Sequence, residues 1–381
     1  MKVEFYKHPL GEDEIASLAE VIRSTFLTSG PKTKEFETQF AEYMRAKYCS
    51  GVTSWTMGGF IALKALGIGP GDEVITTPMT FMATANIIIE CGATPVFVDV
   101  EPETGNISCD EIARAITPRT KAILPVHLYG QMCDMRTMSE IARMHNLAIV
   151  EDCAHSVESE RDGIKPGELS DMAVFSFYAT KNLASGEGGA ITTNNEELSD
   201  KLLKLRLHGM NKSAADRYSA RFRHYDMEVL GYKCNMFDIQ AAMLLPQLPC
   251  IAERLERREY ICNRYEEAFR NVEAITYPTV LPGSVHGRHL FTIWVDPEIR
   301  DAVLSDLQDR GIGVAVNFRS INRLTYYKEH FAIPDGTFPI AERIGDSTIT
   351  LPLYTKLTEE EIDYVIRQTI ESVHKNSMEK H

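Results

Sequence analysis

The stretch Phe175-Ser176-Phe177-Tyr178-Ala179-Thr180-Lys181-Asn182-Leu183, followed by Ser185-Gly186-Glu187-Gly188-Gly189, carries the pattern that decides the fold. An apolar strand over residues 172–177 leads Lys181 into a loop, a glycine-rich turn follows, and residues 189–193 predict another strand. A lysine on such a loop is partly removed from water, which lowers its pKa and makes its amine nucleophilic. The alternative is a solvated lysine beside a flexible turn, and these residues alone do not decide between the two.

Upstream of this stretch, short apolar strands alternate with amphipathic helices. Strands are predicted over 71–77, 94–100, 121–127 and 147–150, and helices over 12–25, 33–43, 57–66, 81–91, 109–116 and 135–144. Repeated β–α–β units with apolar strands predict a mainly parallel sheet that helices cover on both faces. The active site of such a sheet lies at the carboxyl ends of its strands.

Downstream of about residue 245 the pattern changes. A long charged helix is predicted over 251–271, and the segments 290–295, 302–310, 314–318 and 359–373 suggest a smaller α+β lobe. The 381 residues are also too many for one ordinary core. We therefore expect an α/β protein with a large domain over residues 1–245, including the N-terminal helical segment, and a small C-terminal domain over residues 246–381.

Composition and charge exclude several classes of protein. Hydrophobic residues make up 44% and charged residues 25%, as in soluble globular proteins, and the net charge of −14 disfavours a nucleic-acid partner. No apolar run reaches membrane-spanning length and the N-terminus has no apolar signal segment, so we expect no membrane partner and a cytoplasmic location. The eight cysteines form no C-x-x-C pair, so neither a metal site nor a disulfide framework is expected.

A second chemical element is the strand that ends in Glu151 and Asp152 and is followed by His155. A pyridinium cofactor needs an anion at its ring nitrogen in order to act as an electron sink, and Asp152 is well placed to supply it. The competing interpretation is that Asp152 caps a helix. His155 either holds a ring oxygen of the cofactor or is an ordinary hydrogen-bonded polar residue.

A third element is Val52-Thr53-Ser54-Trp55-Thr56-Met57-Gly58-Gly59, where hydroxyls and backbone amides open a helix. Helix N-termini favour phosphate, and Ser176 can add another hydroxyl, although Ser and Thr at a helix start also serve simply as caps. Phe81, which follows Thr80, can stack on a flat ring or pack in the core.

Taken together, these segments resemble the DegT/DnrJ/StrS sugar aminotransferases, which have the aspartate aminotransferase fold (fold type I of the PLP enzymes). The resemblance spans nearly the whole chain in order and spacing. It rests on residues 28–37, 67–75, 92–100, 151–155, 176–189, 338–343 and 351–354.

The resemblance implies pyridoxal 5′-phosphate (PLP) as cofactor and a role for each matched residue. Lys181 matches the lysine that binds PLP covalently, and Asp152 matches the partner of the pyridine nitrogen, which makes these two the catalytic pair. His155 matches the neighbour of the ring oxygen, and Phe81 the aromatic residue that stacks on the ring. The remaining matches are to the phosphate site: Ser54, Trp55, Thr56 and Ser176. The loop over residues 231–236, which includes Asn235, matches one that reaches the phosphate of the other subunit, which implies a homodimer with shared active sites.

The sequence also departs from the family pattern. Trp55 is bulkier than the Gly or Cys usual at its position, and Lys233 and Asn235 stand where many members have Asn and Arg. The segment 317–322 lacks two histidines that many members carry near the substrate, which leaves the sugar open. Candidates for contacts with a substrate phosphate or carboxylate are Arg319, Lys233, His289 and Arg217, each of which is equally plausible as a surface ion-pair residue.

The function that the resemblance implies is transfer of an amino group from glutamate to a keto sugar linked to a nucleotide. One alternative is a sugar dehydratase of the same fold, but those relatives usually carry histidine in place of the lysine. Another alternative is amination of a cyclitol ketone such as scyllo-inosose. A non-catalytic binding protein that keeps the fold is a third, and the presence of Lys181, Asp152 and Ser176 argues against it.

Overall fold

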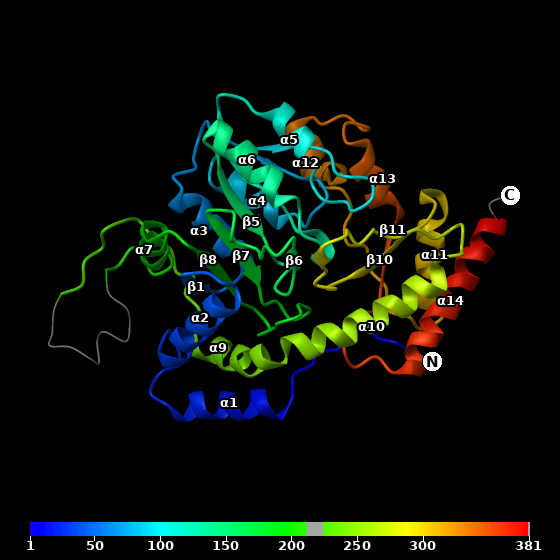
Figure 1. Cartoon of the computed structure of the whole chain (residues 1–381), viewed down its shortest axis with the longest axis horizontal. Coiled ribbons are helices and arrows are strands. Elements are labelled where there is room, and N and C mark those ends of the chain that lie inside the picture. The colour runs from blue at the N-terminus through cyan, green and yellow to red at the C-terminus, as the bar shows by residue number, and fades with distance from the viewer. Residues whose placement is uncertain (212–223, 380–381) are drawn as a thin grey trace.

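Seven strands form one sheet at the centre of the molecule (Figure 1). The computed structural model describes residues 1–211 and 224–379. The strand order is β1-β8-β7-β5-β4-β2-β3, with bounds β1 Tyr48–Val52, β2 Glu73–Thr76, β3 Thr94–Phe97, β4 Thr120–Leu124, β5 Ala148–Asp152, β7 Met172–Ser176 and β8 Gly189–Thr193. The pairs from β3 through β2, β4 and β5 to β7 are all parallel, so the prediction of a mainly parallel sheet is confirmed.

The edge of the sheet at β1 and β8 differs from the rest. Strand β8 runs antiparallel to β7, and β1 runs antiparallel to β8. A loop without a crossover helix joins β7 to β8, and parallel neighbours need such a crossover, so the direction reverses here. Strand β1 is absent from the sequence prediction because its Cys49-Ser50-Gly51 centre lacks the apolar β-branched residues that indicate a strand.

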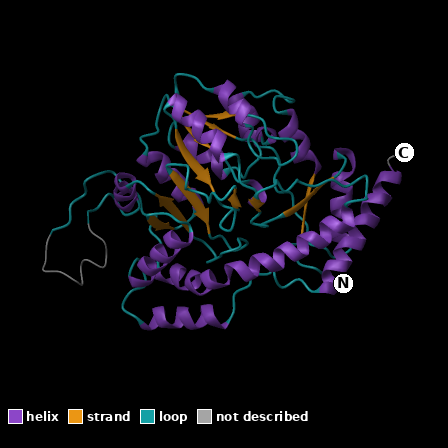
Figure 2. Cartoon of the chain, viewed as in Figure 1, coloured by secondary structure: helices purple, strands orange, loops and turns teal. Residues whose placement is uncertain are grey.

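Helices cover both faces of the sheet (Figure 2). On one face, Val150 and Val174 pack in a cluster with residues of α3 (Trp55–Ala65), α4 (Ala83–Glu90) and α7 (Glu196–Leu205). On the other face, Ile149 packs with α5 (Cys109–Ala115) and α6 (Met135–His145), and Ala173 packs with α2 (Pro31–Tyr43). Successive residues of β5 and β7 therefore point to opposite faces, as the strand geometry requires.

Two helix starts differ from the prediction and shape the site. Helix α3 begins at Trp55 and not at residue 57, because the Ser54 hydroxyl accepts a hydrogen bond from Met57 N–H and caps the helix. Helix α4 begins at Ala83, so Phe81 lies in the preceding loop with 54% of its surface exposed.

The C-terminal part has its own apolar cluster. It is built from α10 (Ile251–Phe269), β10 (Phe291–Trp294), α11 (Pro297–Asp309), β11 (Thr348–Leu351) and α14 (Glu359–Glu379). Figure 1 shows α10 running from α9 (Asp238–Leu244) toward α11 and α14. The other elements are α1 (Glu12–Arg23), β6 (Glu160–Arg161), β9 (Ser284–Val285), α12 (Thr325–Phe331) and α13 (Pro339–Ser347), with short 3₁₀ turns at Leu128–Gly130, Leu245–Cys250 and Ile321–Arg323. The N-terminal Val3 also packs in this cluster.

Within the described residues, none of the helices combines the length and apolar character that crossing a bilayer requires.

Candidate active site

A cavity of about 510 Å³ lies at the carboxyl ends of β5 and β7, beside the start of α3. Residues from distant parts of the chain meet there because strand ends and helix starts share one edge of a parallel sheet. The site residues expected from the sequence that line it are Ser54, Trp55, Thr56, Phe81, Asp152, His155, Ser176, Lys181 and His289.

Asp152, the last residue of β5, is buried at the inner wall of this cavity. The Thr84 hydroxyl donates a hydrogen bond to its Oδ2 at 2.9 Å, and Ala154 N–H donates to its Oδ1 at 3.1 Å. Burial raises the pKa of Asp152 to about 6, although these hydrogen bonds and nearby Lys181 act in the opposite direction. A cation placed in the cavity would favour the ionised carboxylate and would itself be stabilised.

Lys181 enters the same cavity from the loop after β7. Its backbone N–H donates to the carbonyl of Tyr178 at 2.8 Å, which closes a tight turn. Removal from water lowers the pKa of Lys181 to about 8, and the negative charge of Asp152 offsets part of that shift. The unprotonated, nucleophilic amine is therefore far more abundant near neutral pH than it is for a solvated lysine.

The hydroxyl-bearing residues Ser54, Thr56 and Ser176 lie at the end of the cavity where α3 begins. The free N–H groups of the first helical turn and the helix dipole favour an anion at this point. The close approach of α3 to the sheet depends on Gly189. A Cβ atom there would lie 2.7 Å from the carbonyl carbon of Ser54 and 2.8 Å from the nitrogen of Trp55.

Aromatic rings form the walls of the cavity. The His155 ring stacks on the ring of Phe318 at 5.8 Å between centroids, and Phe81 lies 6.0 Å from Phe318. Tyr129 N–H donates to Nδ1 of His155 at 3.2 Å, so the neutral His155 ring carries its proton on Nε2. Burial and nearby Lys181 lower the pKa of His155 well below the usual range, which keeps this ring neutral.

His289 lies deep in the cavity against Lys181. Its Nε2 is 3.4 Å from Lys181 Nζ, and its ring centroid is 4.4 Å from that of His155. Burial and the positive charge of Lys181 lower the pKa of His289 well below the usual range.

Three expected site residues do not line this cavity. Asn235 is buried beside the N-terminal segment, where its amide donates to Ser29 Oγ at 2.7 Å. Lys233 is exposed and donates to the Asn235 side-chain oxygen. Arg319 is exposed next to the lining residues Asn317 and Phe318. Arg217, which was also expected at the site, lies outside the described residues.

The sequence interpretation gave no individual role to several residues that hold or line the site, among them Thr84, Asn182 and Phe318. Thr84 supports Asp152, Asn182 bonds to His289, and Phe318 stacks on His155. Thr84 lies four residues after Thr80, and Asn182 directly follows Lys181. Closeness in sequence to residues already singled out could therefore have indicated both. Phe318 lies in the segment 317–322 that the family resemblance places near the substrate, but only the fold shows that its ring meets His155.

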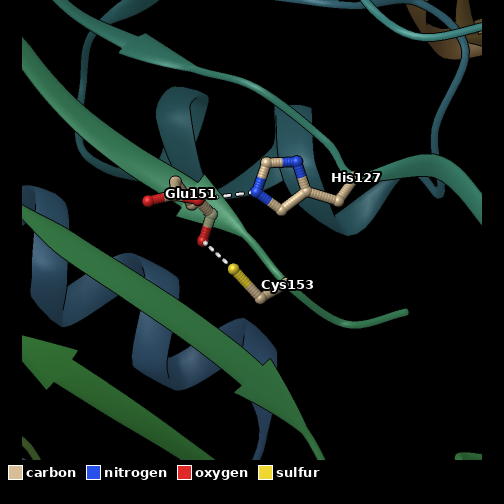
Figure 3. A group of neighbouring side chains, drawn as sticks. All are labelled: His127, Glu151 and Cys153. Atoms are coloured by element: carbon tan, nitrogen blue, oxygen red, sulfur yellow. Dashed lines mark hydrogen bonds and ion pairs between the residues drawn. The ribbon is translucent and has the colours of Figure 1, made fainter. Parts of the chain in front are cut away.

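A separate buried cluster, His127, Glu151 and Cys153, lies around the carboxyl end of β5 (Figure 3). Cys133 N–H donates to Nδ1 of His127 at 3.2 Å, so Nε2–H donates to Glu151 at 2.6 Å. The other Glu151 carboxylate oxygen accepts from Gly167 N–H at 2.8 Å and from the Ser170 hydroxyl. These internal hydrogen bonds engage the nitrogen atoms of His127 and the carboxylate oxygens of Glu151, which a metal ion would need as ligands.

The residues of the cavity fit PLP as a group. A nucleophilic amine and a buried carboxylate that a cation would stabilise share one cavity. Hydroxyls at a helix start suit a phosphate, and Phe81 exposes a flat ring in the lining of the cavity.

Comparison with known proteins supports the same interpretation. The family model "DegT/DnrJ/EryC1/StrS aminotransferase family" matches residues 9–369. The chain is 44% identical over 368 residues to the spore coat polysaccharide biosynthesis protein SpsC of Bacillus subtilis, covering 95% of each chain.

Solved structures share this fold over nearly the whole chain. Spr1654 of Streptococcus pneumoniae in its PLP form superposes with a TM-score of 0.92 and 32% identity, covering 99% of this chain and 100% of that one. PseC of Helicobacter pylori, an aminotransferase involved in the biosynthesis of pseudoaminic acid, has a TM-score of 0.91 and 27% identity, covering 98% and 100%.

Proposed function

Because the chain belongs to the DegT/DnrJ/EryC1/StrS aminotransferase family, we propose that it transfers an amino group from glutamate to a keto sugar linked to a nucleoside diphosphate. The products are 2-oxoglutarate and the amino sugar. The observation that carries the proposal is the meeting of Lys181 and Asp152 in one cavity, next to the hydroxyls at the start of α3. SpsC and PseC, which are named for polysaccharide and pseudoaminic acid biosynthesis, support a sugar as the acceptor.

Each cavity residue has a place in this proposal. Lys181 binds PLP covalently, Asp152 holds the protonated pyridine nitrogen, and the Nε2–H of His155 is free to donate to the ring oxygen. Phe81 stacks on the ring. The phosphate is held by Ser54, Trp55, Thr56 and Ser176. Bound PLP supplies an electron sink that stabilises the carbanion formed when an amino acid loses its α-proton.

The protein's own groups move the protons. Lys181 Nζ, once released from the cofactor, takes the α-carbon proton of glutamate and later returns a proton at the sugar carbon that receives the amine. The pKa of Lys181, lowered to about 8 by burial, suits both directions of transfer. Asp152 remains ionised beside the pyridinium because the opposite charge offsets its burial.

The proposal extends to a homodimer with shared sites. Lys233 and Asn235 lie outside the cavity of their own chain, in contact with Ser29 through Asn235. Exposed Lys233 is available to the phosphate site of a second copy, and buried Asn235 accepts a hydrogen bond from the Lys233 amine.

The decisive experiment compares wild-type protein with Lys181→Ala. Wild-type protein should absorb visible light, and adding glutamate should bleach that band and yield 2-oxoglutarate. Lys181→Ala should lose turnover by roughly 10³-fold or more, because covalent attachment and proton transfer disappear together. A variant that kept full turnover would refute the assignment.

The acceptor is tested separately. Nucleotide-linked 3-keto and 4-keto sugars are offered with glutamate, and the aminated product is detected by mass spectrometry. Amination of scyllo-inosose, with none of any nucleotide-linked sugar, would contradict the proposed acceptor and leave the aminotransferase assignment standing.

A further inference from the structure

We propose that buried Arg258 and Glu158, acting through half-buried Asn182, fix His289 as the tautomer protonated on Nδ1, so that its bare Nε2 accepts a hydrogen bond from the Lys181 amine. The inference rests on the proposed role of Lys181. It makes His289 a further catalytic residue, because Nε2 lies 3.4 Å from the reacting Nζ atom. Asn182, Glu158 and Arg258 act through it as positioning residues.

The network starts from a buried ion pair. The guanidinium of Arg258 contacts one carboxylate oxygen of Glu158, and both side chains are almost completely buried. A buried carboxylate is retained when it is paired and its remaining lone pairs are satisfied. The second oxygen, Oε2, therefore presents a fixed hydrogen-bond acceptor toward Asn182.

Asn182 can satisfy this acceptor in one orientation only. Its Nδ2 group donates to Glu158 Oε2 at 3.0 Å and to the Gly287 carbonyl at 2.8 Å. If the amide were flipped, its oxygen would face two acceptors and leave them without a donor, which is costly in a buried site. The side-chain oxygen of Asn182 therefore faces His289, 3.2 Å from Nδ1.

An amide oxygen can only accept, so His289 Nδ1 must carry the proton. A neutral imidazole has one protonated nitrogen, which leaves Nε2 with a free lone pair toward Lys181. Burial and the positive charge of Lys181 lower the pKa of His289, so the ring stays neutral. The distance of 3.4 Å is long for a hydrogen bond, and contacts of catalytic groups often tighten only when substrate is bound.

Neighbouring His155 has the opposite arrangement. Its Nδ1 accepts from Tyr129 N–H, so its proton lies on Nε2, and the two rings lie 4.4 Å apart. One imidazole thus offers a donor to the cavity and the other an acceptor. A released Lys181 amine that donates one N–H to His289 keeps its lone pair available for the substrate proton.

The tautomer can be measured directly. Full-length holoenzyme labelled with ¹⁵N in its histidines is examined by NMR at pH 7–8, and the His289 signals are identified by their loss in His289→Gln. The expected result is a protonated Nδ1 and a bare Nε2, with that preference lost in Asn182→Leu. A proton on Nε2, on both nitrogens, or an unchanged tautomer in Asn182→Leu would overturn the inference.

A matched pair of variants tests the acceptor in catalysis. His289→Gln retains an oxygen that can accept from Lys181, whereas His289→Leu fills similar space without one. We expect kcat to fall about 10- to 100-fold in His289→Leu and less than about fivefold in His289→Gln, with the KM for glutamate little changed. Equal losses in the two variants would show a purely structural role.

These results separate the two proposals. Absence of transaminase turnover in the wild-type enzyme refutes the proposed function, whereas the NMR measurement is independent of turnover and refutes only the tautomer.

Discussion

At the scale of single residues, Lys181 and Asp152 shift each other's protonation. Burial lowers the pKa of the amine to about 8 and raises the pKa of the carboxyl to about 6, while each charge partly restores the other. Burial in the pocket disfavours the charged forms of both Lys181 and Asp152. A ligand that brings an opposite charge to one of them would offset this cost, so the pocket suits such a ligand. Titratable groups perturbed in this way gather at functional sites.

The first prediction concerns the pH dependence of cofactor attachment. Only the unprotonated Lys181 amine reacts, so the rate at which PLP-free protein binds PLP covalently should rise through about pH 8 and level off above it. Asp152→Asn removes the anion that raises this pKa, so the midpoint should move to lower pH. His155 and His289 also face Lys181, but they stay neutral in this range. Stopped-flow absorbance measures the rate, and a wild-type midpoint near 10.5 would contradict the prediction.

At the scale of elements, strand β5 divides its last two residues between the two faces of the sheet. Asp152 points to the same face of the sheet as Val150 and reaches the cavity beside α4. Glu151 points to the opposite face, as Ile149 does, and reaches His127. Backbone bonds from His127 N–H to Asp152 O and from Asp152 N–H to Pro125 O hold the ends of β4 and β5 together. The internal cluster in Figure 3 therefore supports the strand end that carries Asp152.

A second prediction tests this structural role. His127→Leu removes one donor from the buried Glu151 carboxylate and should lower the free energy of unfolding by about 3 kcal/mol. His145→Leu, at an exposed position at the end of α6, should change it by less than about 0.5 kcal/mol. Denaturant unfolding measures both.

Chelators should leave wild-type activity and Tm unchanged, and a loss of both on chelation would reveal a metal ion.

A third prediction concerns the contact between β8 and α3. Gly189→Ala would place a methyl group against the backbone of Ser54 and Trp55, so either α3 or the strand must shift. We expect a loss of about 1–3 kcal/mol of stability together with weaker PLP binding, because the start of α3 is displaced. Gly69→Ala, with only one atom as near as 4.0 Å, is the matched control. Thermal unfolding and PLP titration provide the two measurements, and unchanged PLP affinity in Gly189→Ala would argue against phosphate binding at α3.

At the scale of the whole molecule, the N-terminus packs against the C-terminal part of the chain, and we expect a second subunit to share the active sites. Val3 pairs with Ile312 and packs in the C-terminal cluster, so the N-terminus joins the part of the chain that follows α10. The division into domains at residues 245 and 246 stays a prediction. Sharing of active sites between subunits stays a prediction as well.

Subunit complementation tests that sharing. One chain carries Lys181→Ala and the other carries Lys233→Ala with Asn235→Ala, and each should be nearly inactive alone. In a mixed dimer, one site combines an intact Lys181 with an intact Lys233 and Asn235. Random mixing should therefore restore about a quarter of wild-type activity, since half of the dimers are mixed and each has one intact site. Mixtures as inactive as their parents would contradict shared sites.

The sequence by itself determined the α/β class and the parallel strands, because hydrophobic periodicity is a local signal. It also predicted that Lys181, Asp152 and the hydroxyls from residue 54 onward belong to one site, because strand ends and helix starts can be located along the chain. It could not determine the antiparallel edge, since β1 lacks a strand-like composition and pairs with β8 far along the chain. The partnership of His289 with Lys181 and Asn182 was likewise decided only by the tertiary structure. His289 lies about a hundred positions along the chain from Lys181 and Asn182. Which nitrogen of His289 carries a proton depends on neighbours that only the fold brings together.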